Sequence, residues 1–395
     1  NILLLSQLGA TTGDTLADIL LGEAYPSGRL STTWAAWEGY STEGDFGDPD
    51  DTHYKEGVYV GYRYFDSVGT APLFPFGYGL GWTTFEQGAP TASIEGSVVT
   101  VPSTVTNTGA RPGKDVVQVY VSSPAGDLDQ PYQALAGFTK TEELAPGASQ
   151  DVNVTFDLSD LASFDAARHS TVLEKGDHVV RAGSSSRDTG VVAVVELAET
   201  AVVRELHDAL GEPGFEDFKP ATPAPVDVPA DAARLAVSAA DLRREDAGEP
   251  VDLTEELAFV KGLTDDELSY LVLGQYADEA DAQSIIGQAS EALVGAAGQS
   301  TTRVEGVPSL VMPDGPAGLR LAAEVGVDEN GPFPLGAALG GLFAELMDPE
   351  SMAAFGLEDD AEPRVPESTY EQYTTAIPIG TAVAQTWNLD VARAF

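Results

Sequence analysis

The chain has 395 residues, of which 63 are acidic and 20 basic, giving a formal net charge of −43 and no cysteine. This balance argues against nucleic acid and anionic membrane surfaces as partners, because neutralising phosphate requires an excess of Lys and Arg. Without cysteine the chain forms no disulfide, thiolate metal site or cysteine nucleophile, which is compatible with a cytoplasmic protein but does not require one. The four scattered histidines favour neither a histidine-rich metal site nor a His-based triad, so we expect no cofactor and no metal.

Residues 1–88 alternate strand and helix signals. The apolar run at 2–5 is too short to span a membrane and lacks the basic flank of a signal peptide, so it predicts a buried strand of a parallel sheet. The apolar spacing over 14–21 predicts a helix that ends at Gly22. Residues 58–65 alternate as in a strand, and residues 72–79 read as irregular and aromatic.

Two side-chain groups in this region have both a functional and a structural interpretation. Four aspartates near His53 suggest a calcium loop, but their spacing fails the EF-hand pattern and favours a solvated acidic loop: Asp45, Asp48, Asp50 and Asp51. Nine aromatic residues suit either sugar stacking at the rim of a site or plain packing: Tyr59, Tyr62, Tyr64, Phe65, Phe74, Phe76, Tyr78, Trp82 and Phe85.

Residues 89–198 carry short strand-like runs separated by turn residues, and this spacing predicts an antiparallel β-sandwich. The clearest runs are 98–105, 116–121, 152–156, 178–182 and 191–195. Residues 199–250 are rich in Ala, Pro, Asp and Glu, which predicts a linker that lies along the surface of its neighbours.

Residues 251–395 return to α/β patterning. Thr264 and Glu267 form a capping-box pattern, with a helix expected from there to Gly274. A short apolar strand is expected at 308–312, and a helix at 381–387.

Asp314 follows the strand expected at 308–312 and lies in a run of Gly and Pro. Loops after strands carry the active site of α/β barrels, and a carboxylate there accepts charge-assisted hydrogen bonds from sugar hydroxyls. The alternative is that Asp314 caps the next turn, since Asp before Gly is a common turn signal. Spacing alone leaves both interpretations open.

Several motifs together resemble glycoside hydrolase family 3, the β-glucosidase-like enzymes. Residues 1–88 are similar to the C-terminal part of the family's α/β sandwich domain through LADILLGEAYPSGRL (16–30), YKEGVYVGYRYFD (54–66) and PLFPFGYGL (72–80). Residues 89–198 resemble its fibronectin type III-like domain through VTNTG (105–109) and AGSSSRD (182–188). Residues 251–395 resemble the start of its (β/α)8 barrel through PDGPAGLR (313–320) and AIPIGTAVAQTWN (376–388).

The resemblance implies a multidomain α/β plus all-β protein in which the usual barrel-first order is swapped. It implies a small carbohydrate substrate, with Asp314 holding hydroxyls of the non-reducing-end sugar and Arg320 supporting the same pocket. The family uses a retaining mechanism with a barrel Asp as nucleophile and a sandwich-domain Glu as acid/base. The chain contains neither the Ser-Asp-Trp context of that nucleophile nor the Lys-His pair of the pocket.

We therefore expect an internal fragment of a β-glucosidase-like enzyme that is inactive by itself, with no catalytic residue of its own. The chain begins without Met and ends within an expected helix, which fits that expectation. Fewer residues follow position 309 than the roughly 200–250 of a complete barrel. The alternatives are a non-catalytic carbohydrate-binding or interaction module and a pseudoenzyme.

Overall fold

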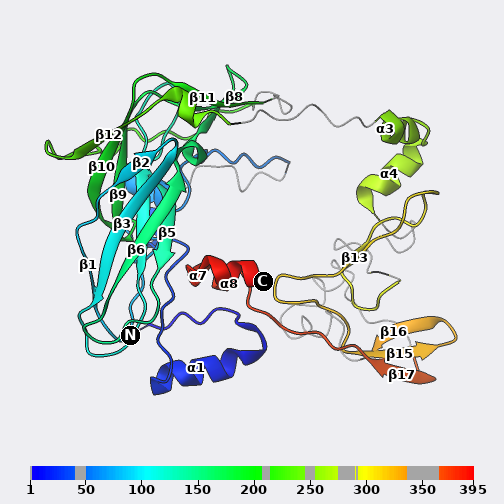
Figure 1. Cartoon of the computed structure of the whole chain (residues 1–395). Coiled ribbons are helices and arrows are strands. Elements are labelled where there is room, and N and C mark those ends of the chain that lie inside the picture. The colour runs from blue at the N-terminus through cyan, green and yellow to red at the C-terminus, as the bar shows by residue number, and fades with distance from the viewer. Residues whose placement is uncertain are drawn as a thin grey trace. The chain divides into compact units, whose positions relative to one another are not determined.

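The computed structural model describes residues 2–40, 50–206, 214–244, 254–274, 290, 292–335 and 364–395 (Figure 1). The chain divides into two compact units. One comprises Ala17–Glu249 with Val383–Phe395, and the other comprises Asn1–Leu16 with Pro250–Ala382. Each is described by itself below. In the described part of the chain, no helix has the length and apolar character that crossing a membrane requires.

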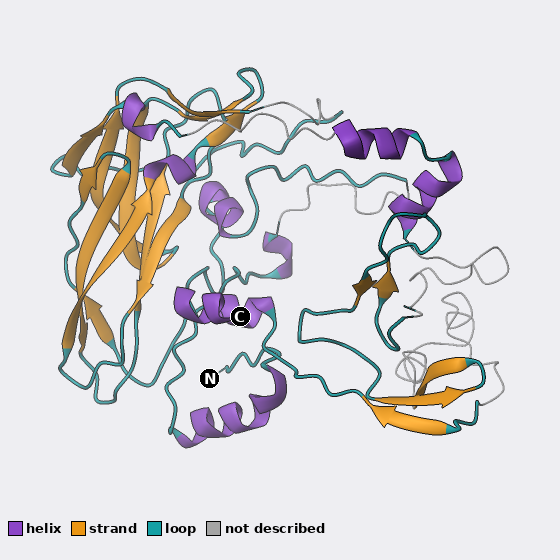
Figure 2. Cartoon of the chain, turned by 45° about the vertical axis from the view of Figure 1, so that its right-hand side comes forward, coloured by secondary structure: helices purple, strands orange, loops and turns teal. Residues whose placement is uncertain are grey.

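A β-sandwich forms the centre of the first unit, as the alternation of apolar residues predicts (Figures 1 and 2). In β3 (Val98–Asn107) every second side chain is buried: Val99, Val101 and Val105 are 0% exposed and Ser103 is 6% exposed, while Val98, Pro102 and Thr104 are exposed. Burial of such a valine stabilises the fold by roughly 1.5–3 kcal/mol. All five predicted runs are strands: β3, β4 (Val116–Ser122), β6 (Ser149–Asp157), β9 (Gly176–Ser185) and β10 (Asp188–Leu197).

Two main sheets enclose the core. In one, β3 pairs with β6 along its whole length, and β1 (Phe85–Gln87) and β2 (Ser93–Glu95) pair with opposite ends of β3. The other sheet has the order β12-β10-β9-β4-β5, with β12 at Ala233–Val237 and β5 at Ala134–Lys140. A third, three-stranded sheet has the order β11-β8-β7, with β11 at Ala201–Glu205, β8 at Ser170–Leu173 and β7 at Ser163–Asp165.

The expected linker 199–250 is partly built into the sandwich. Strand β11 (Ala201–Glu205) pairs with β8, and β12 (Ala233–Val237) pairs in parallel with β10. A 3₁₀ turn at Ala239–Leu242 follows, and Leu242 is fully buried in the hydrophobic core. The linker prediction missed these elements because it rested on the average composition of residues 199–250. The few apolar residues in this stretch that complete the core do not change that average much.

Residues 214–232, which precede β12, run without regular structure, as a Pro-rich segment is expected to do. The Phe218 ring packs against Tyr59 with centroids 5.7 Å apart. The Ala224 amide donates to the Ser67 carbonyl at 2.8 Å. Residues 218 and 224 therefore lie against Tyr59 and Ser67.

Residues before the sandwich contain two helices. Helix α1 (Thr12–Leu21) ends at Gly22, whose φ of +77° is the left-handed conformation that favours glycine. The strand expected at 58–65 is wrong, because this segment ends in helix α2 (Tyr62–Val68). Gly57 and Gly61 both have a φ of +55°, which breaks the extended conformation despite the alternating sequence.

The strand expected at 2–5 is also absent from the structure. A strand buried on both faces needs neighbours, and no described strand pairs with these residues. Their apolar side chains are accordingly exposed, Leu5 by 40% and Ile2 by 80%.

The second unit contains short antiparallel pairings. The strand expected at 308–312 shortens to β14 (Val311–Met312), which pairs antiparallel with β13 (Gly298–Gln299). Strand β15 (Glu324–Asp328) lies between β16 (Gly331–Leu335) and β17 (Ser368–Glu371) in an antiparallel sheet (Figure 2). The described residues of 251–395 thus show no parallel strand pair of the kind that a (β/α)8 barrel contains.

Helices in this part of the sequence follow the predictions more closely. Both halves of the expected capping box are formed between Thr264 and Glu267, at the start of α4 (Asp265–Leu273). Helix α3 (Thr254–Lys261) precedes it. The helix expected at 381–387 is α7 (Gly380–Gln385), and α8 (Leu389–Ala394) follows it.

Candidate functional site

Asp314 and Arg320, the two residues expected to hold sugar, lie together on one loop. Arg320 Nη1 is 3.6 Å from a carboxylate oxygen of Asp314, and the Arg320 amide donates to the Asp314 carbonyl oxygen at 3.0 Å. The loop therefore folds back on itself and places an anion and a cation at its base.

Contacts with residues 375–377 fix the shape of this loop. The Ile377 amide donates to the Ala317 carbonyl at 3.0 Å, and Gly318 has a φ of +102°. A Cβ atom at Gly318 would lie 2.1 Å from the Thr375 carbonyl oxygen. Only glycine suits this position, because it meets both the backbone conformation and the close approach.

Both charged side chains are open to solvent, Asp314 by 51% and Arg320 by 57%. No backbone amide in the described part of the chain donates to the Asp314 carboxylate, so the oxygen atoms there remain accessible to an incoming donor. A carboxylate held beside a guanidinium can accept hydrogen bonds from vicinal hydroxyls while the guanidinium donates to their oxygen atoms.

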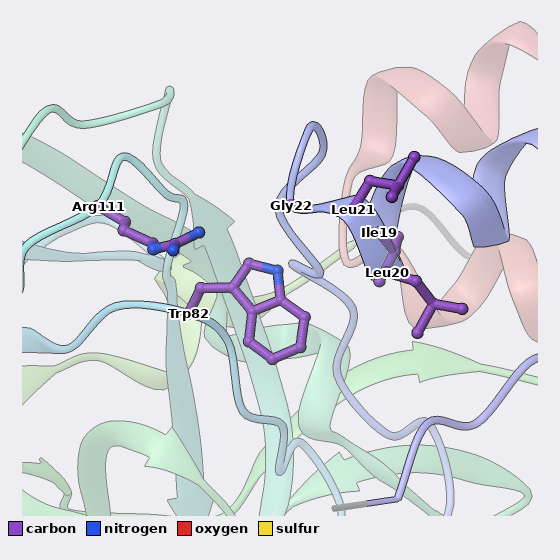
Figure 3. A pocket seen from close by; sticks show the side chains of 6 residues that line it. All are labelled: Ile19, Leu20, Leu21, Gly22, Trp82 and Arg111. Carbon is purple, nitrogen blue, oxygen red and sulfur yellow. The ribbon is translucent and has the colours of Figure 1, made fainter.

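The nine aromatic residues serve mainly in packing, the second of the two interpretations. The rings of Tyr62 and Phe76 stack with centroids 4.5 Å apart, and Phe65 is 2% exposed. Trp82 differs, because nearly half of it is exposed. It lines a pocket together with Arg111 and the last turn of α1 (Figure 3).

This pocket is a feature that the sequence did not indicate. Trp82 was one aromatic residue among nine, and Arg111 follows a turn without any recognisable motif. The only signal was an arginine in a markedly acidic chain.

Metal binding finds no support in the described residues. Asp45 and Asp48 lie outside them, whereas Asp50, Asp51 and His53 are described. Within the ranges that the structure covers, no three His, Cys, Asp or Glu side chains are arranged to hold a metal ion.

Comparison with known families assigns two regions of the chain. Residues 1–82 match the glycosyl hydrolase family 3 C-terminal domain, and residues 115–186 match the fibronectin type III-like domain. The second match lies within the β-sandwich described above.

Individual relatives extend the similarity. The chain is 32% identical over 387 residues to β-glucosidase A of Butyrivibrio fibrisolvens, a match that covers 83% of this chain and 45% of the relative. It is 39% identical over 202 residues to β-glucosidase B of Emericella nidulans, covering 47% of this chain and 24% of the relative. The chain thus spans less than half the length of the curated relatives that it matches here.

A solved structure supports the same assignment. A β-glucosidase from Paenibacillus barengoltzii matches with a TM-score of 0.59 and 27% identity, covering 96% of this chain and 39% of that protein. The resemblance to glycoside hydrolase family 3 that the motifs first indicated is therefore confirmed: the chain carries the C-terminal domain of that family and, next to it, a fibronectin type III-like domain.

Proposed function

We propose that this chain works as part of a retaining β-glycosidase, specifically a β-glucosidase, that hydrolyses O-glycosidic bonds at non-reducing ends. The observation that carries the proposal is the match to Butyrivibrio β-glucosidase A over 83% of the chain. Because residues 1–249 make up less than two thirds of the chain, this match must extend into residues 250–395. Similarity to a β-glucosidase is thus not limited to the two domains that the family models recognise.

Within this enzyme, residues 251–395 are proposed to be the first portion of a (β/α)8 barrel that follows the fibronectin type III-like domain. Three features support the proposal: the PDGPAGLR motif, the single alignment that runs past residue 249, and the loop that joins Asp314 to Arg320.

Asp314 is proposed to bind two hydroxyls of the non-reducing-end sugar, with Arg320 orienting the carboxylate and donating to the same sugar. Each hydrogen bond to a charged group contributes about 1.5–3 kcal/mol. If those bonds strengthen in the transition state, they accelerate the reaction as well as binding the substrate. The substrate class is a small β-glucoside.

The bond-breaking chemistry itself requires two carboxylates about 5–5.5 Å apart, one nucleophilic and one acting as acid and base. The chain lacks the Ser-Asp-Trp sequence and the Lys-His pair that mark the family's catalytic barrel. We therefore propose that the 395-residue chain binds sugar but does not hydrolyse glycosides on its own.

The test uses the complete reading frame that encodes this chain, and in parallel the chain alone, with an aryl β-glucoside as substrate. The complete protein should release the aryl group and yield the β-anomer of glucose first by NMR. The chain alone should show no enzymatic rate. A complete protein that hydrolyses no aryl glycoside would favour a binding module or a pseudoenzyme, and an active isolated chain would overturn its proposed inactivity.

The role of Asp314 is tested by Asp314→Asn in the complete protein. Loss of two charge-assisted hydrogen bonds should lower kcat/KM by about 10²–10⁴-fold. Asp390→Asn is the matched control, because Asp390 also lies in an exposed ion pair, 3.3 Å from Arg393. Equal kinetics for the two variants would remove Asp314 from the site.

A further inference from the structure

We infer that the pocket between Trp82, Arg111 and the end of α1 is a second saccharide-binding site, separate from the Asp314 loop. It has a volume of about 360 Å³ and is lined by Ile19, Leu20, Leu21, Gly22, Trp82 and Arg111 (Figure 3). All six residues belong to the same compact unit.

The pocket offers the three contacts that a sugar uses. The indole of Trp82, 44% exposed, presents a flat apolar face for the C–H groups of a pyranose ring. The Arg111 guanidinium supplies donors, and no acidic side chain among the described residues pairs with it. The last turn of α1 lines the pocket, and no described amide outside the helix donates to the Leu20 or Leu21 carbonyl, so both carbonyls are available as acceptors.

Hydrogen bonds around Asn107 hold the two key segments in place. Asn107 is fully buried, and its amide group donates to the Arg111 carbonyl at 2.7 Å. Its side-chain oxygen accepts from the Thr83 hydroxyl at 2.8 Å, directly after Trp82. One side chain thus fixes the backbone beside both pocket residues, which lowers the entropic cost of binding.

Tyr25 packs against the two segments that carry Trp82 and Arg111. A Cβ atom at Gly81 would lie 1.9 Å from the Tyr25 hydroxyl, and one at Gly113 would lie 2.8 Å from its ring. Tyr25, which lies three residues after Gly22, therefore fills the space between the segments that carry Trp82 and Arg111. The pocket walls are held by close packing and do not depend on a ligand to form.

Size and charge decide between classes of ligand. A stable protein partner would need roughly 800 Å² of surface on each side, whereas this volume lies in the range of about 300–1,000 Å³ typical of small-molecule sites. The strongly acidic chain and the partial negative charge at the helix end oppose the attraction of Arg111 for an anion. A neutral ligand with an apolar ring face and hydroxyls at its edge fits best, and that is a pyranoside.

The experiment measures binding by the 395-residue chain, independently of hydrolysis. The chain is produced with 5-fluorotryptophan in place of its four tryptophans, Trp34, Trp37, Trp82 and Trp387. Each ¹⁹F NMR resonance is assigned from the variant in which that tryptophan is substituted. Methyl β-D-glucoside and cellobiose should shift the Trp82 resonance saturably, with a dissociation constant on the order of 1–10 mM. Sorbitol, a polyol without a ring to stack, should not.

Variants separate this site from others. Arg111→Met, which keeps an unbranched apolar stem but removes the guanidinium, should weaken the Trp82 response about tenfold, and Trp82→Phe should retain binding detected by calorimetry. Trp37→Ala and Asp314→Asn should leave the Trp82 shift unchanged, so a failure here is distinct from a failure of the Asp314 site. An unshifted Trp82 resonance at saturating sugar, or an equal response to sorbitol, would overturn the inference.

Discussion

Arg187 Nε lies 2.5 Å from the carboxylate of Asp66, and this ion pair joins the hairpin between β9 and β10 to helix α2. The same carboxylate accepts from Gln133 at 2.9 Å, and the Arg187 guanidinium donates to the carbonyls of Phe65 and Thr70, each at 2.8 Å. Residues 62–70 of the C-terminal-domain match are therefore held against the fibronectin type III-like domain by charge-assisted bonds.

Asp66→Ala should destabilise the protein by about 2–4 kcal/mol, because it leaves one N–H of the buried Gln133 amide without an acceptor and removes the carboxylate that pairs with Arg187. This value lies below the usual cost of breaking a buried pair, since Arg187 is 34% exposed and regains some water. Burial raises the pKa of Asp66 despite both partners, so Asp66→Asn, which keeps an acceptor oxygen without a buried charge, should cost less.

Urea unfolding of these variants tests the arrangement. Asp177→Ala is the control, because the Asp177–Arg234 pair is about half-exposed and should contribute less than about 1 kcal/mol. If Asp66→Ala were no more costly than Asp177→Ala, the Asp66–Arg187 pair would not hold α2 in place.

Lys140 predicts a pH dependence. Its Nζ donates to the carbonyls of Ser27 and Thr386 at 3.0 and 2.7 Å, and burial, followed by Arg29 and Lys114, lowers its pKa from 10.5 to about 8. Asp115 opposes this shift. Between pH 8 and 10.5 the unfolded chain binds more protons at this position than the folded protein, so stability increases with pH through this window.

The stability difference between wild type and Lys140→Met should therefore change by about 2–3 kcal/mol in favour of wild type from pH 7.5 to 10.5. Taking the difference cancels the titration of tyrosines common to both proteins. Lys140→Arg keeps its charge over this range and should follow the Met variant. If the difference in unfolding free energy between wild type and Lys140→Met did not change with pH, the lowered pKa of Lys140 would be contradicted.

Trp387 anchors the segment Val383–Phe395 to the sandwich. Its indole donates to the Arg29 carbonyl at 3.2 Å and packs edge-on against Phe138 with centroids 4.9 Å apart. Because Trp387 is almost fully buried, Trp387→Ala should cost about 3–5 kcal/mol by thermal or urea unfolding. Trp37→Ala, at a position 86% exposed, should stay within about 0.5 kcal/mol of wild type.

Asn107→Asp replaces the amide donor by an acceptor while preserving shape. The carbonyls of Arg111 and Leu144, each 2.7 Å from the Asn107 amide nitrogen, would then face a carboxylate. We expect a loss of about 2–5 kcal/mol in unfolding free energy, measured in urea. Thr104→Val, on the exposed face of the same strand, should cost far less. Equal losses would argue that the hydrogen bonds of Asn107 do not hold the neighbouring segments in place.

How far the sequence reveals the fold depends on how each element is stabilised. Strands such as β3 alternate clearly because one face is buried, and periodicity detects that. Strand β5 was not predicted, because its seven residues are all partly buried and the pattern has no contrast. The segment 58–65 has the alternation but becomes a helix after Gly61, where backbone conformation and aromatic packing outweigh the pattern.

The candidate sites divide in the same way. Asp314 and Arg320 are close in sequence, so a motif could bring them to notice, and the structure places them side by side. Trp82 and Arg111 meet through Asn107, Thr83 and Tyr25, residues spread over the chain. No local spacing encodes such a meeting, because it depends on tertiary packing.

The parallel pairing of β12 with β10 has a practical consequence for anyone isolating the fibronectin type III-like domain. A version that stopped near residue 198 would expose the hydrogen-bonding edge of β10 along Ala193–Leu197. It would also lose Leu242 from the core. Such a version should self-associate through the uncovered strand, whereas one extended to residue 244 keeps its own edge strand and should remain monomeric.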